Sequence, residues 1–325
     1  MKAKLAFSFV AAGAVAAALW APAADAQTYP TKPVRIIVPF GAGGPADLFA
    51  RYLGQQLQGQ LGQSLIIEDR PGAGSIIGTD VVAKSPPDGH TLLLMSNTHT
   101  VNESLVPKKP FALMKDFMPI APINSSDLLL VVHPSVPAKS VKQLVALAKS
   151  KPSGLNYASS GTGTPYHMAG ELFKALAGVD IVHVPHKSSG EARTSVMSGQ
   201  VEMMLDAITT MAPQARAGKV RALGTTGKTR SAITPELPTV SEAGVKGYEA
   251  TIWLGLMAPA ATPRPILEKL SLETNKIVNA PEVREAWAKQ GAAPMGMSVD
   301  EFRKFLAEDV QKWSKLVKET GMKVN

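Results

Sequence analysis

The sequence contains no cysteine among its 325 residues. This absence excludes disulfide scaffolds, thiolate metal sites and cysteine nucleophiles, so a bound metal would need histidine and carboxylate ligands. Aromatic residues make up only 6% of the chain and charged residues 18%, whereas 45% of the residues are hydrophobic. That fraction is enough to form the core of one large domain or two ordinary ones, and it excludes disordered and collagen-like chains.

Basic residues outnumber acidic ones by 34 to 26, which gives a formal net charge of +8. Such a surplus suits nucleic acid, an anionic membrane surface or an acidic small ligand. The lysines and arginines are spread along the chain and do not form runs, so the sequence does not predict a nucleic-acid-binding stripe. We expect no nucleic-acid partner and no membrane-spanning segment in the mature chain.

The N-terminus has the pattern of a secretory signal peptide. Lys2 and Lys4 precede an uncharged run over residues 5–22, and Ala24-Asp25-Ala26 offers small residues at the positions that a signal peptidase reads. We predict cleavage after Ala26, which leaves 32 basic and 25 acidic residues and a net charge of +7. The alternative is an uncleaved anchor helix, which the weakly apolar, alanine-rich run disfavours.

From residue 34 onward, short aliphatic runs alternate with helix-like stretches. Residues 34–40 are typical of a strand and residues 45–58 of a helix, and further strands are expected at 64–68, 91–95, 128–133, 155–158, 181–184, 201–205, 220–224 and 252–258. Several of these runs lack polar alternation, as expected for parallel strands covered on both faces. We therefore predict an α/β fold with open, mostly parallel sheets flanked by helices.

Two polar stretches, 124–127 and 242–249, are the best candidate breaks between domains. Two breaks make one domain discontinuous. We predict a first lobe built from residues 27–126 and 248–325, and a second lobe built from residues 127–247. At the C-terminal end, Ser298 and Glu301 have the spacing of a capping box and predict the start of the last helix.

Three glycine-containing turns follow predicted strands, at residues 40–47, 70–75 and 159–165. A turn of this kind exposes backbone N–H groups at the positive end of a helix dipole, which suits a carboxylate or a phosphate. The first turn also fits G-x-G-x-x-A, with Glu68 as the ribose-binding acid, so a dinucleotide site is a rival that the export signal argues against. A tight turn without a ligand is the other alternative. Arg70 either pairs with an acidic ligand or bridges Glu68.

Other sequence motifs that could indicate nucleotide binding, metal binding or catalysis lack the neighbouring residues that those functions need. Residues 222–229 pass a loose P-loop pattern, but Pro235 and Pro238 follow too soon for the helix that a P-loop opens. His183 and His186 lack a third metal ligand, and neither H-E-x-x-H nor G-x-S-x-G occurs. We expect no cofactor, no metal and no catalytic residues. Helix N-termini from the first and third turns, facing each other, would instead clamp an anion.

Nearly the whole mature chain, from Tyr29 to about Lys318, resembles the periplasmic solute-binding receptors of tripartite tricarboxylate transporters, also called Bug-type receptors. The matching motifs are Tyr29-Pro-Thr-Lys-Pro-Val-Arg-Ile-Ile-Val-Pro-Phe40, Gly43-Gly-Pro-Ala-Asp47, Arg70-Pro-Gly-Ala-Gly74, Pro87-Asp-Gly-His-Thr-Leu-Leu93, Gly161-Thr-Gly-Thr-Pro-Tyr-His-Met-Ala-Gly-Glu-Leu-Phe173, His183-Val-Pro-His-Lys187, Pro238-Thr-Val-Ser-Glu-Ala-Gly244 and Trp253-Leu-Gly-Leu-Met-Ala-Pro259.

The resemblance implies a two-lobe periplasmic-binding-protein type II fold that closes on its ligand like a Venus flytrap. It also implies a monomeric, non-enzymatic protein whose partners are a small organic acid and the permease subunits of a tripartite tricarboxylate transporter. The implied ligands are di- and tricarboxylates or aromatic acids, held by backbone amides of glycine-rich loops. Departures from the family pattern include Ala46, where threonine is frequent, and Ser75, where a second glycine is usual.

Carried onto this sequence, the resemblance and the turns together predict the following ligand-binding residues: Phe40, Ala42, Gly43, Gly44, Asp47, Arg70, Ser96, Asn97, Thr98, Ser159, Ser160, Gly161, Thr162, Gly163, Thr164, His167, Lys187 and Asp206. The predicted function is capture of a small carboxylate in the periplasm and its delivery to the permease. The alternatives are a protein that presents the ligand to a membrane sensor kinase, and an exported enzyme that acts on a carboxylated substrate.

Overall fold

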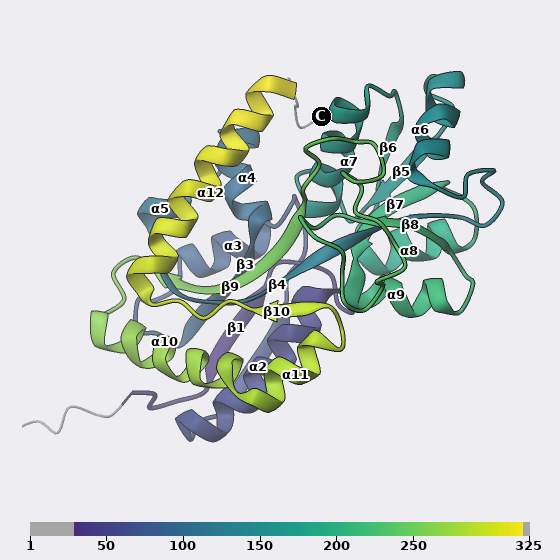
Figure 1. Ribbon diagram of the computed structural model, residues 1–325. Helices are drawn as coiled ribbons and strands as arrows, with labels where there is room; N and C mark the ends of the chain where they lie inside the picture. The colour runs from purple at the N-terminus through teal and green to yellow at the C-terminus, as the bar shows by residue number, and fades with distance from the viewer. Residues whose placement is uncertain (1–28, 321–325) are drawn as a thin grey trace, which may run out of the picture.

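One long strand, β4 (Phe117–Val132), connects the two halves of the molecule in the computed structural model, which describes residues 29–320. Its first part pairs antiparallel with β9 (Thr251–Pro259), and its last part pairs antiparallel with β7 (Met203–Ala207) and β8 (Arg221–Thr225). Figure 1 shows β4 passing from the half that holds both ends of the described chain into the teal half. The signal peptide lies outside the described residues.

The first half contains strands in the order β2-β1-β3-β9-β4, with β10 added on β4. Its other strands are β1 (Val34–Val38), β2 (Leu65–Asp69), β3 (Thr91–Ser96) and β10 (Ala292–Pro294). Its helices are α2 (Pro45–Leu61), α3 (Ile76–Ala83), α4 (Asn97–Leu105), α5 (Leu113–Asp116), α10 (Arg264–Asn279), α11 (Pro281–Ala288) and α12 (Val299–Thr320).

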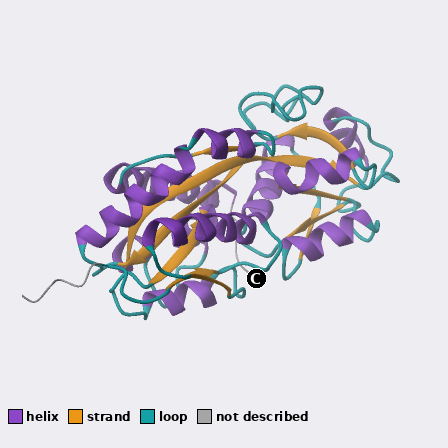
Figure 2. Cartoon of the chain, turned by 90° about the horizontal axis from the view of Figure 1, so that it is seen from below, coloured by secondary structure: helices purple, strands orange, loops and turns teal. Residues whose placement is uncertain are grey.

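The second half adds strands β5 (Asn156–Ser159) and β6 (Val182–Pro185) to β7, β8 and the end of β4. Its helices are α6 (Val141–Ser150), α7 (Pro165–Ala177), α8 (Ser189–Met197) and α9 (Ile208–Arg216). Seen from below, the long strands run along the molecule with helices on both sides of them (Figure 2). The predicted α/β fold is confirmed.

The sheets are mixed, whereas we predicted mostly parallel ones from the sequence. The pairs β1-β2, β1-β3, β5-β6 and β5-β7 are parallel, but β4 and β9 are antiparallel to their neighbours. The reason is that β4 carries the chain out of the first half and β9 brings it back. Residues 124–127, where we predicted a break between the lobes, lie within β4 and pair with residues 251–254 of β9, so the chain passes from one half to the other inside a strand.

Buried hydrophobic residues form separate cores in the two halves. Most of those up to Ile123 and from Trp253 onward pack around the first sheet, and most of those from Leu128 to Ile252 pack around the second. These cores support our proposal that the chain forms two lobes. The second core extends a few residues past the predicted boundary at residue 247, because Tyr248, Ala250 and Ile252 belong to it. We call residues 29–126 and 248–320 lobe 1, and residues 127–247 lobe 2.

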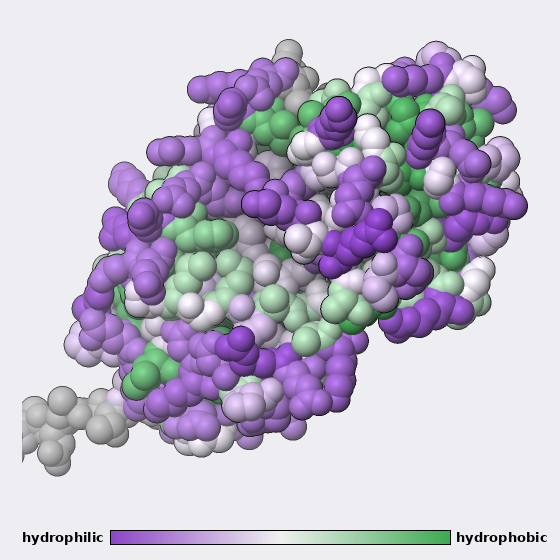
Figure 3. Space-filling view, in the orientation of Figure 1, coloured by the Kyte–Doolittle hydropathy of each residue, from purple (hydrophilic) through white to green (hydrophobic). Residues whose placement is uncertain are grey.

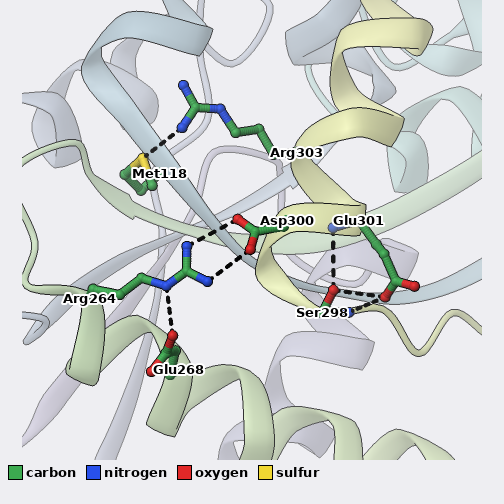
Figure 4. A network of polar contacts seen from close by, with 7 residues as sticks. All are labelled: Met118, Arg264, Glu268, Ser298, Asp300, Glu301 and Arg303. Carbon is green, nitrogen blue, oxygen red and sulfur yellow. Dashed lines mark hydrogen bonds and ion pairs between the residues drawn. The ribbon is translucent and has the colours of Figure 1, made fainter.

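Polar contacts fix the last helix of lobe 1 to its neighbours (Figure 4). The Ser298 Oγ accepts from the Glu301 N–H at 3.3 Å, and Glu301 Oε2 accepts from the Ser298 N–H at 2.8 Å, so the predicted capping box is confirmed. Arg264 donates to both carboxylate oxygens of Asp300, at 3.0 and 2.9 Å, and thereby joins α10 to α12. Because these groups are exposed and water screens their charges, the pairs orient the two helices more than they stabilise the fold.

On the face that Figure 3 shows, hydrophilic residues are spread over both halves and do not form a single stripe. Within residues 29–320, none of the helices combines the length and apolar character that crossing a bilayer requires.

Candidate ligand-binding site

A cavity of about 380 Å³ lies between the two lobes. Lobe 1 contributes the loop after β1, the loop before α3, the end of β3 and two residues of β9, while lobe 2 contributes the loops before α7 and α8. The lining residues are Pro39, Phe40, Gly41, Gly44, Pro45, Ala46, Pro71, Gly72, Ala73, Gly74, Ser75, Ser96, Ser160, Gly161, Thr164, Pro165, Tyr166, His186, Lys187, Ser188, Ser189, Ile252 and Leu254.

Five helices begin at this cavity. Their N-cap residues are Gly44 of α2, Ser75 of α3, Ser96 of α4, Thr164 of α7 and Ser188 of α8, and all five line it. The first amides of a helix have no intrahelical acceptor, and the helix dipole places partial positive charge there. Since the lining contains no aspartate or glutamate, the cavity is suited to an anion.

Apolar groups form much of the remaining wall. Phe40, Ile252 and Leu254 line the cavity together with Pro39 and Pro71. A small ligand with a hydrocarbon middle and anionic ends would place its methylene groups against these side chains. The volume is within the usual range for small-molecule sites.

The first loop is held from behind by Asp47, which is only 5% exposed. Its Oδ2 accepts from the Gly43 N–H at 2.9 Å, and its Oδ1 lies 2.5 Å from Arg51 Nε. Arg51 also contacts Asp69 at 2.9 Å. Burial, and then the Asp47 charge, raise the pKa of Asp69 above its usual value. Asp47 therefore supports the loop and does not line the cavity.

Two stacked histidines hold the loop of lobe 2. The rings of His167 and His183 lie 4.0 Å apart, His167 Nδ1 accepts from the Gly163 N–H at 3.0 Å, and His183 Nε2 lies 2.6 Å from Ser159 Oγ. The Ser159 Oγ in turn accepts from the Gly161 N–H at 3.1 Å. Burial lowers the pKa of His167 to about 4 and that of His183 to about 3, so both rings are neutral at ordinary pH.

A buried ion pair supports the loop before α8. Arg193 Nε lies 3.1 Å from Oδ2 of Asp206, whose side chain is fully buried at the end of β7. Burial raises the pKa of Asp206 to about 6, and the Arg193 charge opposes this shift. Arg193 Nη2 also donates to the Gly43 carbonyl at 3.2 Å, which is a contact from lobe 2 to lobe 1.

The structure places Arg70 away from the cavity. Its guanidinium pairs with Glu68, and together with Arg35 it lowers the pKa of that carboxyl, Arg35 having the larger effect. Of the two alternatives for Arg70, the structure therefore has the bridge to Glu68.

Asn97, another predicted ligand-binding residue, is used for a contact within the protein. Its Nδ2 donates to the Thr251 carbonyl at 2.9 Å and so joins α4 to the start of β9.

The predicted ligand-binding residues thus fall into two groups. Those that line the cavity are Phe40, Gly44, Ser96, Ser160, Gly161, Thr164 and Lys187. Those that do not line it are Ala42, Gly43, Asp47, Arg70, Asn97, Thr98, Ser159, Thr162, Gly163, His167 and Asp206. The second group includes several residues that hold the lining loops from behind, and for these the prediction of direct contact is not supported by the geometry.

Several residues that line the cavity are not among those predicted from the sequence, including Ser75, His186 and Ser188. Ser75 is 3% exposed, and its Oγ has no hydrogen-bond partner within the protein. Ser188 is the N-cap of α8 and accepts from the Glu191 N–H at 3.2 Å. The Ser-x-x-Glu spacing of Ser188 and Glu191 was a signal in the sequence that could have revealed the start of α8. His186 lines the cavity, and no metal-binding group of histidines and carboxylates is found in residues 29–320.

Two α/β lobes joined by a shared strand pair, with an anion-suited cavity between them, define a periplasmic binding protein in fold and site. Residues 49–322 match the tripartite tricarboxylate transporter family receptor, and the chain belongs to this family. Receptors of this kind are periplasmic.

The chain is similar to the protein BugT of Bordetella pertussis, with 36% identity across 97% of this chain and 96% of that protein. Two solved structures from Rhodopseudomonas palustris are also similar. One is Rpa4515 with adipate, with a TM-score of 0.87, 32% identity, and coverage of 90% of this chain and 98% of that one. The other is MatC with bound malate, with a TM-score of 0.84, 32% identity, and coverage of 89% and 100%.

Proposed function

We propose that this protein captures a small dicarboxylate in the periplasm and delivers it to the permease of a tripartite tricarboxylate transporter, without catalysing a reaction. The observation that carries this proposal is the convergence of five helix N-termini on one cavity that contains no carboxylate. The dicarboxylates adipate and malate in the two similar structures support the ligand class.

Backbone amides and hydroxyls are the groups that would hold the acid. The amides before α2 and α7 lie on opposite lobes, and Ser96, Ser160 and Thr164 add hydroxyls to the lining. Hydrogen bonds to an ionised carboxylate are about twice as strong as those between neutral groups. A dicarboxylate that contacts both lobes binds the closed arrangement better than the open one, and this difference drives closure.

A thermal-shift screen of the mature protein, residues 27–325, tests the ligand class. Adipate, malate, a tricarboxylate and an aromatic acid are compared with dimethyl adipate, which has adipate's shape without its charges. A ligand at 100 times its dissociation constant adds about 2.7 kcal/mol to the free energy of unfolding. We expect stabilisation by dicarboxylates and none by the ester. Equal stabilisation by the ester, or none by any acid, would contradict the proposal.

Delivery to a permease requires a cellular test. We expect that deletion of the gene abolishes uptake of the bound acid, and that the full chain restores it while residues 27–325 without the signal do not. If deletion removed only a transcriptional response to the acid and left uptake intact, the sensor alternative would replace the transport proposal. Conversion of the bound acid by the purified protein would instead establish an enzyme.

A further inference from the structure

The two lobes touch along a narrow seam beside the cavity. At this seam the loop after β1 in lobe 1 meets the start of α8 in lobe 2, and the Arg193 guanidinium donates across it to the Gly43 carbonyl. A second contact between the lobes is the packing of Met168 of α7 with Val101 and Leu105 of α4 and with Trp313 of α12. The lobes are therefore in contact with each other in this structure, as a closed arrangement around a ligand requires.

Two glycines of lobe 1 leave no room for a side chain at this seam. A Cβ on Gly41 would lie 2.7 Å from Ser188 Cβ, and a Cβ on Gly44 would lie 2.8 Å from Ser189 Oγ. Both distances are shorter than real Cβ contacts, and both contacted atoms belong to lobe 2. Any side chain at these positions would meet the other lobe before the lobes reached their closed positions.

The backbone itself does not require glycine at these two positions. Neither residue has a positive φ, and Gly44 has φ −85° and ψ 169°, which an L-amino acid adopts freely. Gly43 between them does have a positive φ of 74°, but a Cβ there would meet no atom within 4 Å. Backbone conformation thus explains Gly43, whereas the approach of lobe 2 explains Gly41 and Gly44.

We propose that Gly41 and Gly44 are positioning residues for lobe closure, because the absence of their side chains lets lobe 1 reach the start of α8. This inference rests on the proposed function, since closure matters only in a protein that encloses its ligand. Alanine at either position leaves the fold of each lobe intact and opposes closure. We call Gly41 and Gly44 the closure glycines.

The two substitutions differ in severity. Ser188 Cβ is fixed to the backbone and cannot turn away from a Cβ on Gly41. Ser189 Oγ can rotate, at the loss of its hydrogen bond from Arg193 Nη2 at 3.2 Å. We therefore expect Gly41→Ala to block closure more strongly than Gly44→Ala. Removing the opposing atom should restore closure, as Gly44→Ala with Ser189→Ala tests directly, because no other lobe 2 atom lies within 4 Å of that Cβ.

The experiment measures lobe separation with spin labels in the mature chain. Because the protein has no cysteine, labels attach only to Lys149→Cys on α6 and Arg284→Cys on α11, two exposed positions on different lobes. Distances are recorded without ligand, with adipate or malate, and in concentrated trimethylamine N-oxide, an osmolyte that favours burial of surface without a ligand. Gly59→Ala is the matched control, since its Cβ would meet nothing within 4 Å.

We expect the wild type and Gly59→Ala to reach the same short distance, Gly41→Ala to stay at the long one, and the double variant to recover what Gly44→Ala loses. Adipate binding should weaken about 5- to 100-fold in Gly41→Ala, the range typical of overpacking. The inference is overturned if Gly41→Ala closes as fully as the wild type, with either acid or the osmolyte. The proposed function fails separately if neither acid changes the wild-type distance while the osmolyte does.

Discussion

The buried pair of Arg193 and Asp206 gives the sharpest test of how the site is supported. In Arg193→Met, a chain of similar length replaces the cation, so the change removes the charge and the hydrogen bonds to Gly43 and Ser189. The Asp206 side chain is fully buried and the Arg193 side chain is 14% exposed, so water cannot replace the lost partner. Removing one member of a buried ion pair costs about 3–5 kcal/mol, because the other charge remains buried and uncompensated.

The size of this loss depends on pH. Burial raises the pKa of Asp206 to about 6 in the folded protein, above its ordinary value of 3.8. A raised folded pKa means that protonation favours the fold, so the cost of the Asp206 charge is absent at low pH and appears as the pH rises through the folded pKa. At about pH 5 the carboxyl is largely neutral in both proteins. The difference between them should then fall to about 1–2 kcal/mol, the cost of the Arg193 hydrogen bonds that are lost at every pH.

Urea unfolding of residues 27–325 at about pH 5 and about pH 7.5 measures both differences. The control is Arg193→Met with Asp206→Leu, which removes both charges and should recover most of the stability at the higher pH. An equal loss at the two pH values, or no recovery in the double variant, would refute the reasoning that an unpaired buried charge causes the effect.

Two further predictions concern the cavity and the loop of lobe 2. Ser75→Ala should weaken adipate binding in calorimetry about 2- to 10-fold and leave urea unfolding of the ligand-free protein unchanged, because the Ser75 Oγ has no partner within the protein; a change in unfolding alone would assign Ser75 a structural role. Burial lowers the pKa of His183 to about 3 from 6.5, so folding stability is lost as the pH falls below about 6.5. In urea unfolding at a series of acid pH values, the free energy of unfolding of His183→Gln should fall by up to about 1.4 kcal/mol less per pH unit than that of the wild type. If the free energies of both proteins fell equally with pH, protonation of His183 would not be the cause.

The sequence predicted the fold class and the helix starts of the two glycine-rich turns because both depend on local signals. Pro45 and Pro165 begin α2 and α7 as the turns indicated, and Gly178 ends α7 in the left-handed conformation. These signals place backbone amides without any knowledge of long-range contacts.

The features that we did not predict from the sequence depend on contacts between residues far apart in the chain. Residues 124–127 have the composition of a linker, but β9 pairs with them and makes them part of β4. The family resemblance placed Asp47 and Asp206 among the ligand-binding residues, yet each pairs with an arginine and lies behind the lining. Which charge finds a partner depends on the tertiary fold, so residue type alone did not separate supporting residues from lining ones.

A crystal structure of residues 27–325 with a bound dicarboxylate, adipate first, tests the central claim most directly. We predict that at least one carboxylate accepts hydrogen bonds from backbone amides at the starts of α2 and α7, with the methylene groups against Phe40, Ile252 and Leu254. A ligand held chiefly by the Lys187 ammonium, or bound outside the cavity between the lobes, would contradict the account.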